Sequence, residues 1–516
     1  MLSTVSSGAL RGVEAFPVEV EVNTGECGEP RLVLVGLPDS AVKESQNRVF
    51  SALMTTQFAI PRTHTTVNLS PGDLRKEGSL YDLPIALGIL QSTRQTPLSH
   101  LSEYIVAGEL SLSGRLLPIK GSVALALLAR KCKKSLLLPR LSAEEASWVK
   151  DVKVFAVDDL RDAVKFLNHP DREPVVASWK DDDQEPVYDV DFSEVQGQEA
   201  LKRAIEIAVS GGHNLLMVGS PGSGKSMLAQ RIPTIMPRSS FEEYLECLNI
   251  YSASGTVMDE YQRKYQRPFR SPHHTMSDVG LLGGGRLPGP GEVSLAHTGV
   301  LFLDELPEFH RSTLEVLRQP LEDGKVSISR SAGKIQLPAA FMLVAAMNPC
   351  PCGYLMDPRR ACHCSSMQIQ RYRSKISGPL LDRIDIHADV VGVSSSELRY
   401  RKPLESSAQI RQRVQKTREI QKQRFANIGM PIWTNARMGS NHIREFCSLD
   451  SESEKILSMA SERLGLSARA YYRILKVSRT IADMAEAPNI TSEHILEALQ
   501  YRSREMSWMP PFAKAV

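Results

Sequence analysis

The stretch that decides the fold is Gly219-Ser-Pro-Gly-Ser-Gly-Lys225-Ser226, which follows the apolar run Leu215–Val218 and precedes a helical segment. It matches the phosphate-loop pattern GxxxxGK[ST] in the strand, loop and helix order that the motif requires. Its glycines let backbone N–H groups curl around phosphate oxygens, and the N-terminus of the next helix adds the positive end of a dipole. The stretch therefore predicts a nucleotide-binding α/β domain.

Each position of this phosphate loop has an expected role in binding ATP. We expect Lys225 to bind the β- and γ-phosphates, and Ser226 to hold Mg²⁺. The other residues that should contact the nucleotide are Gly219, Ser220, Pro221, Gly222, Ser223 and Gly224. A glycine-rich turn without function is the alternative, but the flanking strand-like and helical segments favour a nucleotide site.

A second apolar run, Val300–Leu303, ends in two acids. A buried strand of this kind would carry both to its C-terminal end. We expect Asp304 to order the Mg²⁺ ion, and Glu305 to orient and deprotonate the attacking water. Two acids after a strand are often merely solvated, but the phosphate loop upstream favours the catalytic interpretation.

Three further polar residues are candidates for contact with the γ-phosphate. Asn348 follows the apolar run Phe341–Ala346, and we expect its side chain between the two earlier strands, near that phosphate. Arg383, in a Leu-Leu-Asp-Arg-Ile-Asp string, is predicted to act as an arginine finger on the ATP of a neighbouring subunit. Arg469 begins a later helix and could reach the same ATP from a lid, with an ordinary surface arginine as the alternative.

The composition indicates a globular protein of several domains. The chain has 516 residues, 42% of them apolar and 23% charged, which corresponds to about three domains. A net charge of +3 permits contact with nucleic acid without arguing for it. The chain does not begin like a secretory signal, and no run of about 18 apolar residues occurs in it. We therefore expect a cytoplasmic protein with no membrane partner.

Sequence pattern divides the chain into four parts. Residues 1–168 alternate strand-like and helical runs and predict a mixed α/β domain. Residues 169–191 are rich in charge and proline, as an exposed linker should be. Residues 192–393 alternate strands and helices around glycine-rich turns and predict the ATPase domain. Residues 394–516 predict an all-helical lid.

Four of the eight cysteines form two Cys-x-Cys pairs within residues 350–364: Cys350, Cys352, Cys362 and Cys364. Four thiolates at this spacing can close a tetrahedral Zn²⁺ site, although Cys-x-x-Cys is the more usual spacing. In a reducing compartment a metal is favoured over disulfides, and free thiols are the alternative. Because four protein ligands leave no open position, the expected role of the ion is structural.

The chain resembles the Mg-chelatase-like AAA+ ATPase family over nearly its whole length. The most specific stretches are Phe269–Thr275, Gly280–Gly285, Pro290–Phe309 and Gln368–Arg373. The resemblance implies an AAA+ P-loop core of the α/β class, with a Lon-protease-like N-terminal domain (ribosomal S5 domain 2-like) and an all-α C-terminal lid. It also implies a homo-hexameric ring that acts on DNA as a branch-migration helicase in natural transformation, as competence proteins of this family are regarded to do.

Two segments are candidates for contact with DNA. The resemblance to related ring motors implies a pore-facing loop at residues 273–296, and the glycines and prolines there independently favour a loop. Residues 325–337 predict two β-runs joined by a tight turn, with Arg330 and Lys334 at the tip. Cations on such a hairpin can grip phosphates without reading sequence, but an ordinary solvated hairpin is an equal alternative.

Residues 108–119 resemble part of the proteolytic domain of the Lon family. Catalysis in that family needs a serine and a lysine, and the lysine activates the serine as nucleophile. Here Leu80 and Val123 occupy those two positions, and Ser79 and Lys120 are displaced from them. We therefore expect no peptidase activity.

Three functions remain open at this point. The first is an ATP-dependent DNA motor. The sequence supports its ATPase activity far more strongly than its action on DNA. The second is a magnesium-chelatase-type ATPase subunit, against which the Lon-like domain and the cysteine cluster argue. The third is a protein-remodelling ring, which stimulation of ATP hydrolysis by protein clients would favour.

Overall fold

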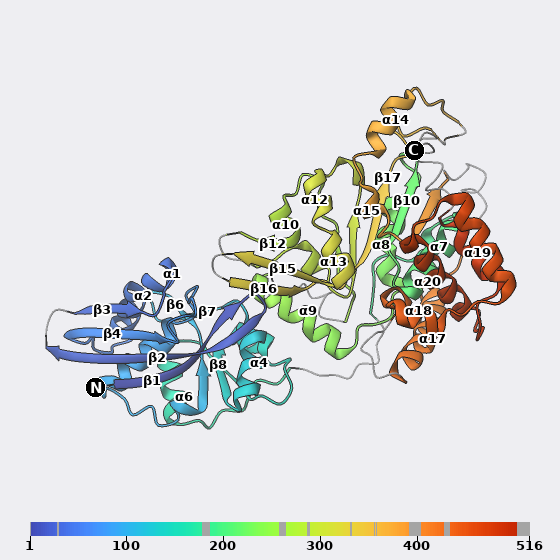
Figure 1. Cartoon of the computed structure of the whole chain (residues 1–516). Helices are drawn as coiled ribbons and strands as arrows, with labels where there is room; N and C mark the ends of the chain where they lie inside the picture. The colour runs from blue at the N-terminus through green and yellow to red at the C-terminus, as the bar shows by residue number, and fades with distance from the viewer. Residues whose placement is uncertain are drawn as a thin grey trace.

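Three regions follow one another along the chain (Figure 1). In this computed structural model the blue N-terminal domain lies at one end, green to yellow segments form the centre, and orange and red helices cover the far side. The structure describes residues 2–27, 30–177, 186–256, 265–285, 289–330, 333–355, 357, 359–391, 404–427 and 434–502. The chain is a mixed α/β protein with a parallel sheet and C-terminal helices, which confirms the predicted fold class.

The N-terminal domain contains a four-stranded sheet in the order β1-β2-β4-β3. Its strands are β1 (Leu2–Arg11), β2 (Glu14–Cys27), β3 (Arg31–Val35) and β4 (Thr63–Ser70). β3 is parallel to β4, whereas the other neighbours are antiparallel. Thr65, Val67 and Leu69 are buried and alternate with more exposed residues, as in a strand with one face on the core.

Helix α3 (Asp82–Ser92) packs on β1 and β2 and is buried along almost its whole length. Gly88 has no side chain at the closest approach, where a Cβ atom would come within 2.5 Å of Val22. A second, parallel sheet combines β5 (Tyr104–Val106), β8 (Ser135–Pro139) and β9 (Val154–Val157). The remaining elements are α1 (Ser40–Lys43), α2 (Ser45–Thr55), β6 (Glu109–Leu110), β7 (Leu116–Leu117), α4 (Ser122–Cys132), α5 (Arg140–Ala146) and α6 (Leu160–Asn168).

The central region is built on a five-stranded parallel sheet in the order β11-β14-β17-β10-β18. Its strands are β10 (Leu215–Gly219), β11 (Phe269–Arg270), β14 (Val300–Leu303), β17 (Met342–Met347) and β18 (Ile386–Val390). β10, β14 and β17 are apolar and buried throughout, as expected of parallel strands covered on both faces. Because the strands are parallel, their carboxyl ends meet at one edge of the sheet.

Helices and a hairpin surround this sheet. The longer helices are α7 (Glu199–Gly211), α8 (Lys225–Ile235) and α9 (Phe241–Ser254), and the shorter elements are α10 (Asp278–Leu282), β12 (Gly283–Gly284), β13 (Gly289–Pro290), α11 (Glu292–Leu295), α12 (Arg311–Glu315) and α13 (Arg318–Asp323). The predicted hairpin is present as antiparallel β15 (Lys325–Arg330) and β16 (Gly333–Pro338), which extends toward the N-terminal domain (Figure 1).

The C-terminal region is helical. Its elements are α17 (Ser407–Ala426), α18 (Ser440–Phe446), α19 (Ser451–Leu464), α20 (Ala468–Met484) and α21 (Ser492–Gln500), whereas α14 (Ser366–Arg373) and α15 (Gly378–Leu381) precede β18 of the central sheet. Asp483, 1% exposed, accepts hydrogen bonds from both Arg424 and Arg479, so this buried carboxylate is paired. None of the helices within the described ranges is both long enough and apolar enough to cross a membrane.

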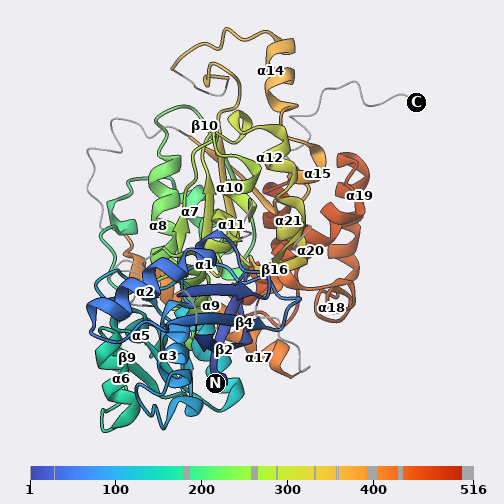
Figure 2. The ribbon, with the colours of Figure 1, turned by 90° about the vertical axis from the view of Figure 1, so that its left-hand side faces the viewer.

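The N-terminal domain packs against α9 (Figures 1 and 2). The N–H of Gly121 donates to the carbonyl oxygen of Ser252 at 2.9 Å, and the rings of Trp148 and Tyr244 meet edge to face at 5.3 Å. The guanidinium of Arg11 donates to the carbonyl oxygen of Lys334 on β16 at 3.1 Å. Buried apolar residues of the two domains form one continuous cluster, so the N-terminal domain is a docked part of the molecule rather than a tethered one.

Candidate functional site

The phosphate loop joins β10 to α8 at the carboxyl edge of the sheet. Gly222 and Gly224 have φ of 74° and 93°, a backbone conformation that other residues rarely adopt. Gly219 lies against β18, where a Cβ atom would come within 2.3 Å of the carbonyl oxygen of Val390. The glycines of the motif are therefore required by the shape of the loop itself.

Lys225 lies at the start of α8 with its ammonium group turned back into the loop. Nζ donates to the carbonyl oxygens of Gly219 at 2.7 Å and Ser220 at 3.0 Å, and to Oδ1 of Asn348 at 3.2 Å. The residue is 8% exposed. Burial lowers the pKa of its ammonium group, although the nearby carboxylates of Asp304 and Glu305 act to raise it. A poorly hydrated cation at the mouth of a phosphate loop is suited to an anionic ligand.

The predicted Mg²⁺ ligands are adjacent. The hydroxyl of Ser226 donates to Oδ2 of Asp304 at 2.6 Å, across the gap between α8 and the end of β14. Hydroxyl and carboxylate oxygens are the donors that Mg²⁺ prefers, and it usually takes only one or two from the protein. These two side chains therefore fit a Mg²⁺ ion that bridges to phosphate oxygens.

Asn348 follows β17, which lies between β10 and β14 in the sheet. The amide oxygen accepts from Lys225, so the side chain does reach the mouth of the phosphate loop. This placement agrees with the expectation that Asn348 lies between the two earlier strands. Lys225, Ser226, Asp304 and Asn348 thus meet at one edge, although they are up to 123 residues apart in the chain.

Glu305 leaves β14 in a left-handed backbone conformation with φ of 52°, which turns the residue out of the strand direction. Its carboxylate is 57% exposed and lies 3.6 Å from Nδ1 of His274. The ring of His274 also contacts that of His273, with centroids 4.1 Å apart and the planes tilted by 33°. Sequence analysis placed His274 only within a loop; its closeness to Glu305 arises because β11 and β14 are parallel neighbours.

Arg383 lies between α15 and β18 and is 8% exposed. Its guanidinium pairs with Glu322 at the end of α13, with 2.5 Å between the charged groups, and donates to the carbonyl oxygen of Pro379 at 2.6 Å. In the single chain the predicted arginine finger is therefore held by its own subunit. The structure does not bring Arg383 to the phosphate loop of the same chain by any described contact.

Arg469 is exposed on the first turn of α20. One turn later, Arg473 forms an ion pair with the buried Asp385 and donates to the carbonyl oxygen of Arg383 at 3.0 Å. The positive charge of Arg473 acts against burial and keeps the pKa of Asp385 well below its usual range. Arg473 thus joins the helical region to the segment that carries Arg383, a contact that sequence analysis missed although Arg469 and Arg473 share a helix face.

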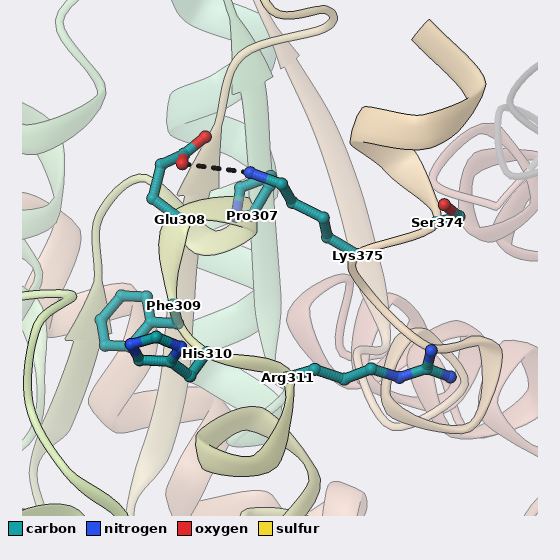
Figure 3. Close-up of a pocket in the computed structure, with 7 residues that line it drawn as sticks. All are labelled: Pro307, Glu308, Phe309, His310, Arg311, Ser374 and Lys375. Atoms are coloured by element: carbon teal, nitrogen blue, oxygen red, sulfur yellow. Dashed lines mark hydrogen bonds and ion pairs between the residues drawn. The ribbon is translucent and has the colours of Figure 1, made fainter. Parts of the chain in front are cut away.

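A pocket lies just beyond Glu305 (Figure 3). Its lining comes from the segment after β14 and the end of α14: Pro307, Glu308, Phe309, His310, Arg311, Ser374 and Lys375. Lys375 and Glu308 pair at 3.1 Å across it. The residues of the phosphate loop do not line this pocket, so it adjoins the candidate ATP site without being it.

The four clustered cysteines lie together after β17. Their sulfur atoms are all within 4.8 Å of one another, and Cys350 is buried. A backbone hydrogen bond from Tyr354 lowers the pKa of the Cys352 thiol to about 6. Among the described residues, this cluster is a group of side chains placed closely enough to bind one metal ion. Zinc binding there stays a prediction.

The two candidate DNA-binding segments differ in how far they are described. Residues 278–296 form α10, the β12–β13 pair and α11, with 286–288 outside the described residues. Arg270, on β11 before this segment, pairs with Glu292 at the start of α11 at 2.6 Å. On the other hairpin Lys334 is exposed, whereas the turn and the side chain of Arg330 lie outside the described residues.

The Lon-like positions do not assemble a serine–lysine pair. Leu80 and Val123 are buried, and the hydroxyl of Ser79 donates to Glu109. Lys120 lies instead beside Gly255 at the end of α9, where a Cβ atom would come within 2.4 Å of its side chain. The expectation of no peptidase activity stays a prediction that this arrangement favours.

Comparison with known proteins assigns the chain to a family. Three models match: "Magnesium chelatase, subunit ChlI" at residues 191–398, "Subunit ChlI of Mg-chelatase" at 18–142, and "Magnesium chelatase, subunit ChlI C-terminal" at 404–502. The chain is 44% identical to competence protein ComM of Haemophilus influenzae and 42% identical to the uncharacterized protein YifB of Escherichia coli, each over 97% of both chains. It is 28% identical to Lon protease 2 of Bacillus subtilis over 141 residues, 26% of each chain. The chain therefore belongs to the Mg-chelatase-like AAA+ ATPase family, together with ComM and YifB.

Proposed function

We propose that the chain is an ATP hydrolase that works as a homo-hexameric ring on DNA, as a branch-migration helicase of the ComM type. The observation that carries the proposal is the meeting of Lys225, Ser226, Asp304 and Asn348 at one edge of the parallel sheet. The ATPase core of the family and 44% identity to a competence protein support it. ATP and Mg²⁺ are the implied cofactors, and the cytoplasm is the expected location.

Each residue of the site has its own proposed role in ATP hydrolysis. Lys225 would leave its contacts with the loop carbonyls and Asn348 for the β- and γ-phosphates, where its charge is better compensated. Ser226 and Asp304 would hold Mg²⁺, which neutralises charge on the phosphates when bound. The rest of the loop, from Gly219 to Gly224, would supply backbone N–H groups.

Glu305 is the proposed general base. Its carboxylate is more than half exposed beside the site, so it is free to accept a proton from a water positioned for in-line attack. His274 is within reach of the same carboxylate and would compete with that water for it. Asn348 would report the γ-phosphate, because it already contacts the lysine expected to bind there.

A ring would complete the site from the neighbouring subunit. In the single chain the guanidinium of Arg383 pairs with Glu322, and arginine fingers supplied in trans stabilise charge on the transferring phosphoryl group. Arg469, exposed on α20, would contribute from the lid. We expect isolated subunits to hydrolyse ATP slowly for this reason.

The DNA part of the proposal is tested by moving a junction. Wild-type protein, Lys225→Ala and Arg383→Ala would be compared on labelled three-strand and four-way DNA junctions with ATP and Mg²⁺. We expect only the wild type to convert the junctions. If the wild type hydrolyses ATP but neither binds nor moves DNA, the motor proposal fails while the ATPase remains.

The chelatase alternative is favoured by one specific observation, since all three family models are those of a magnesium chelatase subunit. A porphyrin metallation assay with the partner subunits distinguishes it. Insertion of Mg²⁺ that depends on Lys225 would establish that alternative in place of the DNA motor.

A further inference from the structure

The cysteine cluster touches the ATP site at two points. Cys350 lies two residues after Asn348, the candidate contact for the γ-phosphate, so the cluster is adjacent to that residue in the chain. Gly353, with φ of 86°, lies so close to the phosphate loop that a Cβ atom would come within 2.5 Å of Cδ of Pro221. The guanidinium of Arg373 donates to the carbonyl oxygen of Pro349 at 3.1 Å and fixes the chain between Asn348 and Cys350.

The positions of the sulfur atoms suit one tetrahedral ion. Sγ of Cys350 is 3.3 Å from that of Cys352 and 3.6 Å from that of Cys362, and the latter two are 3.5 Å apart. Four thiolates at the usual Zn–S length would be about 3.8 Å from one another. A disulfide needs about 2.05 Å, so none of these pairs is bonded. The donor set is that of a structural zinc site rather than a magnesium or calcium site.

Apart from these contacts, the described part of the segment is joined mainly by polar contacts, such as that of Arg360 with the hydroxyl of Tyr354 at 2.9 Å. From the end of β17 to the start of α14, the described residues include no helix or strand, and Leu355 is 39% exposed. Among the described residues 348–355, 357 and 359–365, the buried ones are Pro349, Cys350 and Gly353. Because apolar burial is small here, an ion would supply most of the free energy that orders the segment.

We propose that one Zn²⁺ ion is bound by Cys350, Cys352, Cys362 and Cys364. This ion holds Asn348 and Pro221 in the positions that ATP binding requires. The metal then acts through positioning, since four thiolates leave it no coordination site for substrate. Loss of the ion releases the segment and loosens both contacts with the nucleotide. The second half of this proposal rests on the proposed ATPase function; the first does not.

Metal content tests the first half. Zinc would be measured by elemental analysis in the full chain, in Cys362→Ser/Cys364→Ser and in the control Cys132→Ser, whose thiol is exposed in the N-terminal domain. We expect about one zinc per chain in the wild type and the control, and almost none in the double variant. Replacement by Co²⁺ should give the absorption of tetrahedral thiolate coordination. A wild type that stays free of zinc after reconstitution, with the four cluster thiols open to a thiol reagent, would overturn the proposal.

The second half is tested by stripping the metal from the wild type and restoring Mg²⁺ alone or Mg²⁺ with Zn²⁺. In the stripped protein we expect the affinity for a fluorescent ATP analogue and the rate of ATP hydrolysis each to fall at least about tenfold. Added zinc should restore both. Lys225→Ala should keep its zinc. Unchanged ATP binding and hydrolysis after stripping would refute the coupling, whereas a zinc-loaded wild type without hydrolysis would refute the ATPase and leave the metal site standing.

Discussion

The two α/β regions of this molecule use polar residues in opposite ways. In the N-terminal domain the buried Asp82 is fully satisfied by Arg48, Ser45 and the N–H of Leu110. In the ATPase core the ammonium group of Lys225 donates to loop carbonyls and to Asn348, beside the half-buried Asp304 and the exposed Glu305. The first arrangement is closed on itself and stabilises a fold, whereas the second is open to a ligand. A buried charged side chain indicates a functional site only where its partners in the protein leave space for a ligand to contact it.

The largest expected effect contrasts the lysines of the two regions. Lys225→Ala should lower ATP hydrolysis by at least about a thousandfold, because no other described side chain can replace its contacts with the phosphates. Lys120→Ala, in the N-terminal domain, should leave the rate within about twofold. Steady-state phosphate release measures both. Equal losses in the two variants would mean that the N-terminal domain takes part in catalysis.

Removal of the closed ion pair should act on stability and not on chemistry. Asp82→Ala leaves the guanidinium of Arg48 without its carboxylate in a largely buried setting and should lower the free energy of unfolding by about 3 kcal/mol. Urea denaturation followed by circular dichroism measures this loss. Ser45→Ala, which removes one hydroxyl hydrogen bond to the same carboxylate but keeps the ion pair, should cost about 1.5 kcal/mol and serves as the control. If Asp82→Ala is as stable as the wild type but inactive, the interpretation of Asp82 as structural is wrong.

The two regions should also differ in their response to pH. Burial lowers the pKa of His387, on β18, to about 3, whereas an unfolded histidine has a pKa of about 6.5. Between these values the unfolded chain binds the extra proton, so stability falls as pH falls; from pH 7.5 to 5.5 the loss is about 1.4 kcal/mol for this residue. In the N-terminal domain His64 is exposed and His100 half-buried, whereas His387 is 3% exposed.

Urea denaturation at the two pH values checks this prediction. His387→Phe should show a smaller loss of stability on acidification than the wild type, and the buried His213, whose pKa is also lowered by burial, accounts for part of what remains. An identical pH dependence in the variant and the wild type would show that His387 is not the group responsible.

Local patterns predicted most of the site because each motif lies at the end of its own strand. The runs before Lys225, Asp304 and Asn348 are β10, β14 and β17, and β17 does lie between the other two. Apolar runs in the N-terminal domain likewise coincide with regular elements such as β2, β3, β4 and α3, because strand and helix periodicity are local patterns. The roles of these residues, and the limits 1–168, 169–191, 192–393 and 394–516, stay predictions.

Contacts between distant segments could not be read from the sequence. His274 approaches Glu305 only because β11 pairs with β14, and Glu322 reaches Arg383 from a helix about 60 residues away. The docking of the N-terminal domain on α9 has no local pattern either, since the buried Tyr244 and Tyr251 look like ordinary core residues of a helix. Such contacts depend on topology, which periodicity does not encode.

The most direct test of the account is the rate of ATP hydrolysis by Glu305→Gln. This change keeps the shape of the side chain but removes the proposed base, so hydrolysis should fall by about 10²- to 10⁴-fold while ATP binding is retained. Glu308→Gln, three residues later and paired with Lys375 outside the site, should stay within about twofold of the wild type. If Glu305→Gln hydrolyses ATP as fast as the wild type, the proposed catalytic centre at the end of β14 is wrong.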